Sequence, residues 1–263
     1  MDNQSFLDPN YVPDQYKVPY DVIELPSQGL LYPNKKSSVR VEYLTAYDEN
    51  ILSSPNLLNS GKYLDVLIKN KVKDLGFDHD LLLDGDRLAI LLFLRTTGFG
   101  NEYVQYVFKE NGDMVEGTID LTTIKSKKLD IKPDQNNEFD FVLPTSNMKI
   151  KFKLLSSKDN KEIDDIDKKT MERNGGLSSL STLKLEKSIM EIDGERDKLK
   201  ISHILKSPKV KILDIRKFNK YLSEIEPGLD LKTTARTNGG ESVDCFLRFG
   251  KNFWFPEVWK FPN

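Results

Sequence analysis

The sequence predicts an α+β fold with a helical core, two small antiparallel β insertions and an extended N-terminal arm. Apolar residues recur with helical spacing up to about residue 100 and again in 157–231, whereas they alternate with period two in 101–156 and 232–263. The composition, 38% hydrophobic and 30% charged, indicates a thin core with wide polar surfaces. A chain of 263 residues can bury such a core without a disulfide or a metal.

Residues 1–21 form the predicted extended arm. Pro13 and Pro19 interrupt the backbone hydrogen bonding of a regular strand or helix. The arm also carries three tyrosines, Tyr11, Tyr16 and Tyr20. Two interpretations stay open. The arm is either a flexible tail or a segment that docks on another protein surface.

The region 22–100 is expected to hold one strand followed by helices. Pro26 fixes φ and Gly29 can adopt a positive φ, which predicts a rigid turn ahead of the strand. The strand is indicated at 39–43, where apolar and charged residues alternate.

Three helices are expected after this strand, and the third should be the most buried. Their predicted ranges are 45–52, 61–72 and 84–97. In the third, Asp84 is the expected N-cap and Gly98 the expected stop. Its centre, 88–94, is apolar on every side, which is typical of a helix enclosed by the core.

The region 101–156 reads as an antiparallel β insertion. A hairpin is predicted at 103–121 around Asn111-Gly112, a dipeptide that favours tight hairpin turns. A second hairpin is predicted at 139–155 around residues 144–147. Four strands in succession suggest one small sheet inserted between helical parts.

The region 157–231 returns to helical spacing. Helices are expected at 158–173, 180–192, 201–205 and 212–225, and the second of these has the weakest periodicity. Pro227 and Gly228 should end the last helix.

The region 232–263 is expected to form a C-terminal β hairpin and an aromatic tail. The hairpin strands are predicted at 233–236 and 242–249. The tail carries five aromatic residues, Phe253, Trp254, Phe255, Trp259 and Phe261. A nine-residue strand of a small domain cannot bury all five, so some complete the core and the rest form an exposed patch. We favour an interface over a purely internal role for this tail.

The charge and cysteine content exclude several classes of protein. The 39 basic and 41 acidic side chains give a net charge of −2, without the basic surplus that nucleic-acid binding needs. Cys245 is the only cysteine, which rules out an intrachain disulfide and favours a reducing compartment. The first twenty residues lack the apolar stretch of a signal peptide, and the longest apolar run is far shorter than a membrane span. We therefore expect a cytosolic site of synthesis, no nucleic-acid partner and no membrane partner.

Residues suited to catalysis are scarce. His79 lies between acids and is expected at the surface, and His203 in a short helix is expected to be half-buried. Neither has metal-ligand spacing, and no phosphate-binding glycine loop is present. Asp164, Asp165 and Asp167 are expected on a solvated face. The sequence thus predicts no enzyme activity, no metal and no cofactor.

Several segments together resemble the T4-like bacteriophage baseplate hub/assembly protein family, which includes the myovirus baseplate hub subunit. The segments are 23–33 (Ile23-Glu24-Leu25-Pro26-Ser27-Gln28-Gly29-Leu30-Leu31-Tyr32-Pro33), 41–52, 81–90 with 98–103, 192–194, 227–231 and 249–256. Their shared order along the chain carries the resemblance. Many relatives hold Cys-x-x-Cys pairs at the two β tips, but residues 109–112 and 238–240 contain no cysteine, so zinc is not expected.

The resemblance implies a structural, non-enzymatic component of the baseplate of a contractile phage tail, in its hub region. The expected partners are other baseplate hub or wedge proteins, with a homo-oligomer in a symmetric ring as a further option. The expected location is the virion, preceded by the host cytoplasm during assembly. A hub assembly chaperone that leaves before maturation is the alternative. The predicted partner-binding residues are Tyr11, Tyr16, Tyr20, Phe253, Trp254, Phe255, Trp259 and Phe261.

Overall fold

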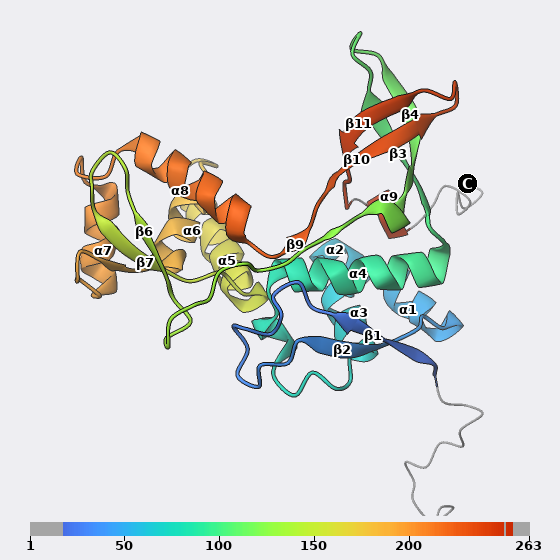
Figure 1. The fold of residues 1–263 in the computed structure, drawn as a ribbon, viewed down its shortest axis with the longest axis horizontal. Helices are drawn as coiled ribbons and strands as arrows, with labels where there is room; N and C mark the ends of the chain where they lie inside the picture. Colours follow the sequence, from blue (N-terminus) through green and yellow to red (C-terminus); the bar gives the residue numbers. More distant parts are fainter. Residues whose placement is uncertain (1–17, 250, 255–263) are drawn as a thin grey trace, which may run out of the picture.

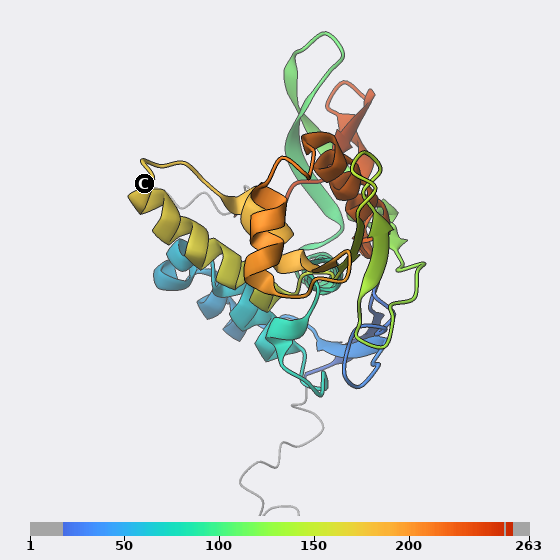
Figure 2. The same cartoon turned by 90° about the vertical axis from the view of Figure 1, so that its left-hand side faces the viewer.

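The computed structural model describes residues 18–249 and 251–254, and its helices and small antiparallel sheets confirm the α+β class. The chain is arranged around the long helix α4 (Asp84–Phe99). A lower layer precedes this helix in sequence, two hairpins stand above it, and a lobe of helices and strands lies to its left (Figure 1). Turned by a quarter, the molecule still shows the hairpins on the side of α4 opposite the lower layer (Figure 2).

The lower layer consists of a two-stranded sheet and short helices. Its elements are β1 (Tyr20–Glu24), β2 (Ser38–Glu42), α1 (Glu49–Leu52), α2 (Pro55–Ser60) and α3 (Tyr63–Lys71), with single 3-10 turns at Ala46–Asp48 and His79–Leu81. Together with α4 they form one side of the core. Ile90, Leu91 and Leu94 of α4 are buried, as predicted. Leu88, Ala89, Leu92 and Phe93 are only partly buried, so the helix is not enclosed on every side.

The ends of α4 differ from the predicted ends. Leu83 rather than Asp84 is the N-cap, and the helix passes through Gly98 to end before Gly100, whose φ is 83°. Gly98 therefore does not end the helix, and it lies where α4 packs against Leu44. A Cβ atom at this position would lie 2.6 Å from Cδ1 of Leu44, so any larger residue requires the Leu44 side chain to move.

The first hairpin of the predicted insertion 101–156 and the predicted C-terminal hairpin share one four-stranded sheet. The hairpin β3 (Glu102–Phe108) and β4 (Met114–Asp120) meets the hairpin β10 (Lys232–Thr237) and β11 (Ser242–Phe246) in the order β11-β10-β4-β3. Thr118 and Gly117 of β4 pair with Arg236 and Thr237 of β10. The sheet is antiparallel throughout, and β3 is one of its two edges.

The second predicted hairpin belongs to the left lobe, which corrects the expectation of one sheet across 101–156. β6 (Phe139–Val142) and β7 (Lys149–Phe152) pair with β8 (Ile189–Ile192). The lobe helices are α5 (Ser157–Arg173), α6 (Leu180–Ser188), α7 (Lys198–Lys206) and α8 (Ile212–Ile225). The physical reason for the separation is aromatic packing, because Phe152 contacts Phe218 of α8 at a ring distance of 5.1 Å. The weakly periodic stretch 180–192 accordingly divides into helix and strand.

Two short strands connect the lobe to the rest of the molecule. β5 (Ser126–Lys127) follows a 3-10 turn at Leu121–Thr123 and pairs with β9 (Gly228–Leu229), which passes over the start of α4 (Figure 1). Among the described residues, no helix has the length and apolar character needed to cross a membrane.

The beginning of the aromatic tail is helical, not extended. Residues Lys251–Trp254 form the short helix α9, and the side chains of Phe253 and Trp254 are 0% and 2% exposed. The Phe253 ring lies 5.2 Å from that of Tyr103, and the Trp254 ring lies 6.3 Å from that of Phe99. These two residues therefore complete the core, and the prediction that they bind a partner is corrected.

Candidate functional site

A buried hydrogen-bond network joins the first turn of the sequence to α4. Oδ1 of Asp86 accepts a hydrogen bond from the backbone N–H of Ser27 at 2.9 Å, and Oδ2 accepts one from the hydroxyl of Tyr32. The same hydroxyl accepts from the N–H of Leu83 at 3.0 Å. Burial raises the pKa of both Asp86 and Tyr32. The network fixes the turn against the start of α4.

The start of α4 also crosses the backbone of residues 227–228 at close range. Gly85 lies on the first turn of α4 and faces Pro227 and Gly228. A Cβ atom on Gly85 would lie 1.9 Å from the carbonyl oxygen of Pro227, so no other residue fits without a shift of the backbone.

Arg95 holds the other end of α4. Its buried guanidinium donates to the carbonyl oxygens of Phe253 at 2.5 Å, Gly100 at 2.6 Å and Glu102 at 2.9 Å. Burial lowers the pKa of Arg95. Carbonyl oxygens thus satisfy the charged group and connect α4, β3 and α9.

Five of the six segments that carry the family resemblance converge on α4. Only residues 192–194, in the turn after β8, lie elsewhere. Their contacts are those of a scaffold, because every polar group described above is directed at another part of the same chain. The surface available to partners must therefore be sought outside these segments.

The predicted partner-binding residues do not form one site. Tyr20 is 50% exposed on β1, and the guanidinium of Arg40 lies 5.3 Å from its ring centroid. Phe253 and Trp254 are internal. The other predicted residues, Tyr11, Tyr16, Phe255, Trp259 and Phe261, lie outside the described part of the chain.

An exposed apolar strip, which we call the β3 strip, runs along the edge of the four-stranded sheet. It consists of Val104, Tyr106, Phe108 and Met114, whose exposed fractions are 47%, 50%, 58% and 59%. Phe108 and Met114 are directly opposite each other in the β3–β4 register, so their side chains share one face. The opposite face of β3 is internal and carries Tyr103 and Val107.

Sequence reasoning missed the β3 strip, although a signal is present. A half-buried strand alternates apolar and polar residues, but 102–108 has apolar residues at both parities. Such a run indicates apolar side chains on both faces of the strand.

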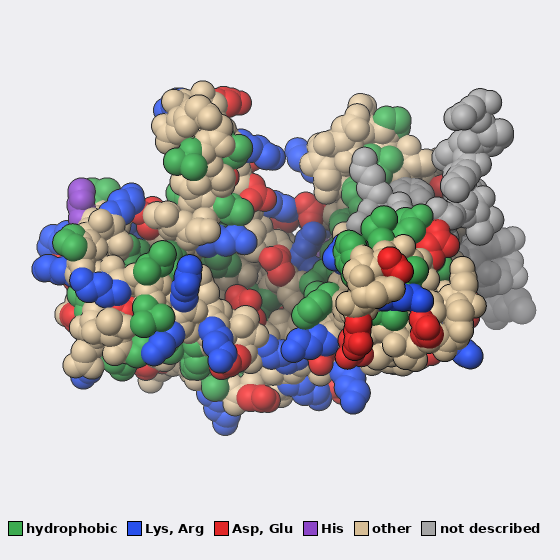
Figure 3. Space-filling model, turned by 90° about the horizontal axis from the view of Figure 1, so that it is seen from above, with side chains coloured by type: hydrophobic (Ala, Val, Ile, Leu, Met, Phe, Trp, Pro, Cys, Tyr) green, Lys and Arg blue, Asp and Glu red, His purple; other side chains and the backbone are tan. Residues whose placement is uncertain are grey.

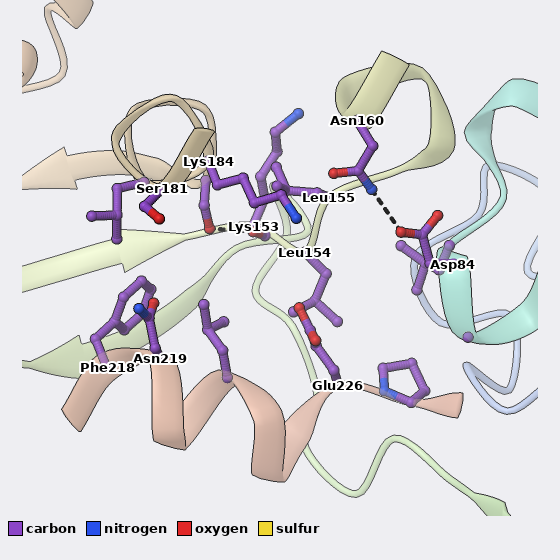
Figure 4. A pocket seen from close by; sticks show the side chains of 16 residues that line it. Asp84, Lys153, Leu154, Leu155, Asn160, Ser181, Lys184, Phe218, Asn219 and Glu226 are labelled. Carbon is purple, nitrogen blue, oxygen red and sulfur yellow. Dashed lines mark hydrogen bonds between the residues drawn. The ribbon is translucent and has the colours of Figure 1, made fainter. Parts of the chain in front are cut away.

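A cavity of about 310 Å³ lies between the start of α4 and the left lobe (Figure 4). Apolar walls come from Leu83, Leu154, Leu155, Leu185, Phe218, Leu222 and Pro227. Asp84, Lys184 and Glu226 also line it. Viewed from above, the surface is hollowed between the left lobe and the hairpins, with side chains of both charges around the hollow (Figure 3).

The carboxylates of Asp84 and Glu226, which both line this cavity, differ in their hydrogen-bond partners. Oδ2 of Asp84 accepts from Nδ2 of Asn160 at 2.8 Å, and Oδ1 accepts from the Ser157 hydroxyl at 3.4 Å. The backbone N–H of Glu226 donates to the carbonyl oxygen of Leu222, but its carboxylate makes no hydrogen bond or ion pair with any described residue. Desolvation raises the pKa of both carboxyls although both residues stay partly exposed, and the charge of Asp84 raises that of Glu226 further.

The residues with potential for other chemistry are dispersed. Nε2 of His79 lies 2.8 Å from the carbonyl oxygen of Val72, and His203 is exposed on α7, which corrects the half-buried expectation. Burial raises the pKa of the Cys245 thiol. Across residues 18–249 and 251–254, no three His, Cys, Asp or Glu side chains are grouped to hold a metal ion.

One predicted surface carboxylate is internal. Asp164 and Asp165 are exposed as expected, but Asp167 is buried and accepts hydrogen bonds from the Ser178 hydroxyl at 2.7 Å and the Ser179 N–H at 2.6 Å. Asp167 thereby connects α5 to the start of α6. The many charged neighbours of Asp167 in the sequence had instead indicated a solvated position.

A scan against protein-family models, a search of curated proteins and a search of solved structures found no match to this chain.

Proposed function

We propose that the chain is a structural, non-enzymatic component of the baseplate of a contractile phage tail, in the hub region, and that it acts by binding other baseplate proteins. The observation that supports this proposal best is the β3 strip, an apolar surface on an edge strand. The resemblance of residues 22–259 to the hub/assembly family supplies the biological setting.

The β3 strip has the physical character of a protein interface. Aromatic residues and methionine are enriched in interfaces, and an apolar patch with a polar surround is typical of one. Glu116, Thr118 and Arg236 supply that surround on the same face of the sheet. The edge strand also lacks the lysine and proline residues by which edges commonly avoid pairing with other chains.

The expected occupant of the strip is another hub or wedge protein, held in the virion. The arm and tail residues Tyr11, Tyr16, Phe255, Trp259 and Phe261 remain predicted contacts of the same assembly. An assembly chaperone would use the same strip transiently. The two roles differ in whether the chain remains in finished particles.

The double variant Phe108→Ser and Met114→Ser tests this proposal. Both side chains are exposed, so thermal unfolding of the purified protein should be unchanged. Interface residues of this kind each contribute roughly 1 kcal/mol or more, so the variant should be incorporated at least about tenfold less into particles. Quantitative mass spectrometry of purified particles measures the incorporation.

Leu199→Ser is the matched control, because Leu199 is an exposed apolar residue on α7 in the left lobe. It should be incorporated normally. Normal incorporation of the Phe108 and Met114 variant would refute the role of the strip. Presence of the wild-type chain in assembly intermediates but not in particles would replace the structural role with the chaperone role.

A further inference from the structure

The cavity between α4 and α8 has the size and composition of a binding site for one side chain. Its volume of about 310 Å³ is at the small end of the ~300–1,000 Å³ range of ligand pockets. Its apolar lining includes Phe218 and Leu222 of α8 and Leu154. Charged side chains come from Asp84, Lys153, Lys184 and Glu226, and further polar groups come from Asn160, Ser181, Ser188 and Asn219. The mixed lining fits an elongated group with an apolar stem and a polar end.

The local field at the end of α8 favours a positive charge. Glu226 directly follows the last helical residue, where the helix dipole already concentrates partial negative charge. Lys127 demonstrates the preference, since its Nζ donates to the Ser223 carbonyl oxygen of this last turn at 2.5 Å. Asp84 adds a second carboxylate at the start of α4, and desolvation raises the pKa of both carboxyls.

The lysines that line the cavity do not supply that cation directly. Lys153 is engaged with Asp159, at 2.8 Å from Nζ to either carboxylate oxygen. Lys184 directs its ammonium group into the space between Asp84 and Glu226 (Figure 4), yet no described residue lies within ion-pair distance of it. Lys184 is exposed at the rim of the cavity, from which a better-fitting cation can displace it.

We infer that this cavity binds a basic side chain, lysine or arginine, from a partner polypeptide. The aliphatic stem packs on Phe218 and Leu222, and the cationic end lies between Asp84 and Glu226. The inference deepens the proposed function by giving the chemistry of one partner contact, and it rests on that function only for the source of the side chain. This contact is separate from the β3 strip. The cavity lies at the start of α4, whereas β3 follows the end of α4.

The test is calorimetric titration of the purified full chain with N-acetyl-arginine amide at neutral pH. N-acetyl-citrulline amide is the matched probe, because it has the same shape without the charge. The arginine probe should bind saturably, and the citrulline probe about tenfold more weakly, as expected for loss of a charge-assisted contact. Affinity should fall as the pH is lowered, since protonation removes the charges of Asp84 and Glu226.

Three variants test where the probe binds and whether the site prefers a positive charge. Glu226→Gln should weaken the arginine probe several-fold, whereas Lys184→Gln should strengthen it by removing the internal competitor. Asp165→Asn, on the exposed face of α5, should leave it unchanged. Thermal unfolding of each variant confirms that the fold is retained.

Several outcomes would overturn the inference. These are the absence of saturable arginine binding, equal binding of both probes, an unaltered affinity of Glu226→Gln, and a weakened affinity of Lys184→Gln, which would indicate an anion site. The β3 strip variants should bind the probe normally. Failure of the titration is thereby distinguished from failure of the proposed baseplate role, which particle incorporation measures.

Discussion

At the scale of single residues, the interior is organised by polar groups whose partners come from distant parts of the sequence. Asp86, Tyr32 and Ser27 form a connected network in which every hydrogen bond is internal. A buried polar group is costly only when it loses a partner, because water cannot replace that partner in the core. The network should therefore be sensitive to the loss of one hydroxyl.

Replacing Tyr32 by phenylalanine removes the donor to Asp86 and the acceptor of the Leu83 N–H. The variant should lower the free energy of unfolding by about 1–3 kcal/mol, measured by urea titration. Tyr43→Phe is the matched control, since the Tyr43 hydroxyl also donates to an aspartate, Asp21, but at the surface. It should change the free energy by less than about 0.5 kcal/mol. Equal effects of the two variants would contradict the role of burial.

At the scale of elements, glycines determine how closely α4 approaches its neighbours. Gly85 meets the chain at Pro227, and Gly98 meets Leu44. Both contacts place a backbone or side chain where a Cβ atom would otherwise be. The position of β9 thus depends on the missing methyl group of Gly85, because the neighbouring atoms are backbone, whereas at Gly98 the Leu44 side chain could move.

Gly85→Ala should force α4 and residues 227–228 apart. Overpacking of this kind costs about 1–3 kcal/mol of unfolding free energy, which thermal or urea unfolding will detect. Gly239→Ala is the control, because the nearest atom to its added Cβ is the Thr237 hydroxyl at 3.7 Å and its φ is ordinary. A stable Gly85→Ala protein would show that the crossing is adaptable.

The sequence allowed the elements to be predicted better than their pairing. Helical periodicity depends on neighbours within a few residues, so the helices near 61–72, 84–97, 158–173 and 212–225 were predicted closely. Pairing of Thr118 with Arg236 depends on contacts across more than a hundred residues, which no local pattern records. The cavity was missed for the same reason, because Asp84 and Glu226 come together only after the lobe has folded.

At the scale of the whole molecule, charged side chains fasten the left lobe to the lower layer. Nζ of Lys161 on α5 lies 2.7 Å from Asp65 of α3 and 2.9 Å from Asp80. Arg87 of α4 also contacts Asp65, at 2.5 Å. The hydrogen bond from Lys161 lowers the pKa of Asp80. For Asp65, burial alone would raise the pKa, but the bonds from Lys161 and Arg87 outweigh it and lower the pKa.

Lys161→Met should therefore weaken the protein in a pH-dependent way. A carboxyl whose pKa is lowered by folding stabilises the protein above its ordinary pKa of 3.8, and this stability is lost as the pH falls through the lowered value. We expect a loss of up to about 1 kcal/mol at neutral pH, since Lys161 is partly exposed, and a smaller loss at acidic pH.

Urea unfolding at neutral and acidic pH measures both losses. Lys220→Met is the control, because Lys220 forms only a surface pair with Glu224 at 3.8 Å and should have no effect at either pH. An equal loss from Lys161→Met at both pH values would assign the effect to packing of the lysine stem.

The contacts of Arg95 have a consequence for biosynthesis. Two of its acceptors, Gly100 and Glu102, follow within a few residues, but the third is the carbonyl oxygen of Phe253. A nascent chain emerges from the ribosome in order, so 158 further residues must follow Arg95 before Phe253 can accept its hydrogen bond and Phe253 and Trp254 can complete this part of the core. Until then Tyr103 and Phe99 lack their aromatic partners. Molecules released early by premature termination would expose this unfinished core, which makes them substrates for cellular quality control.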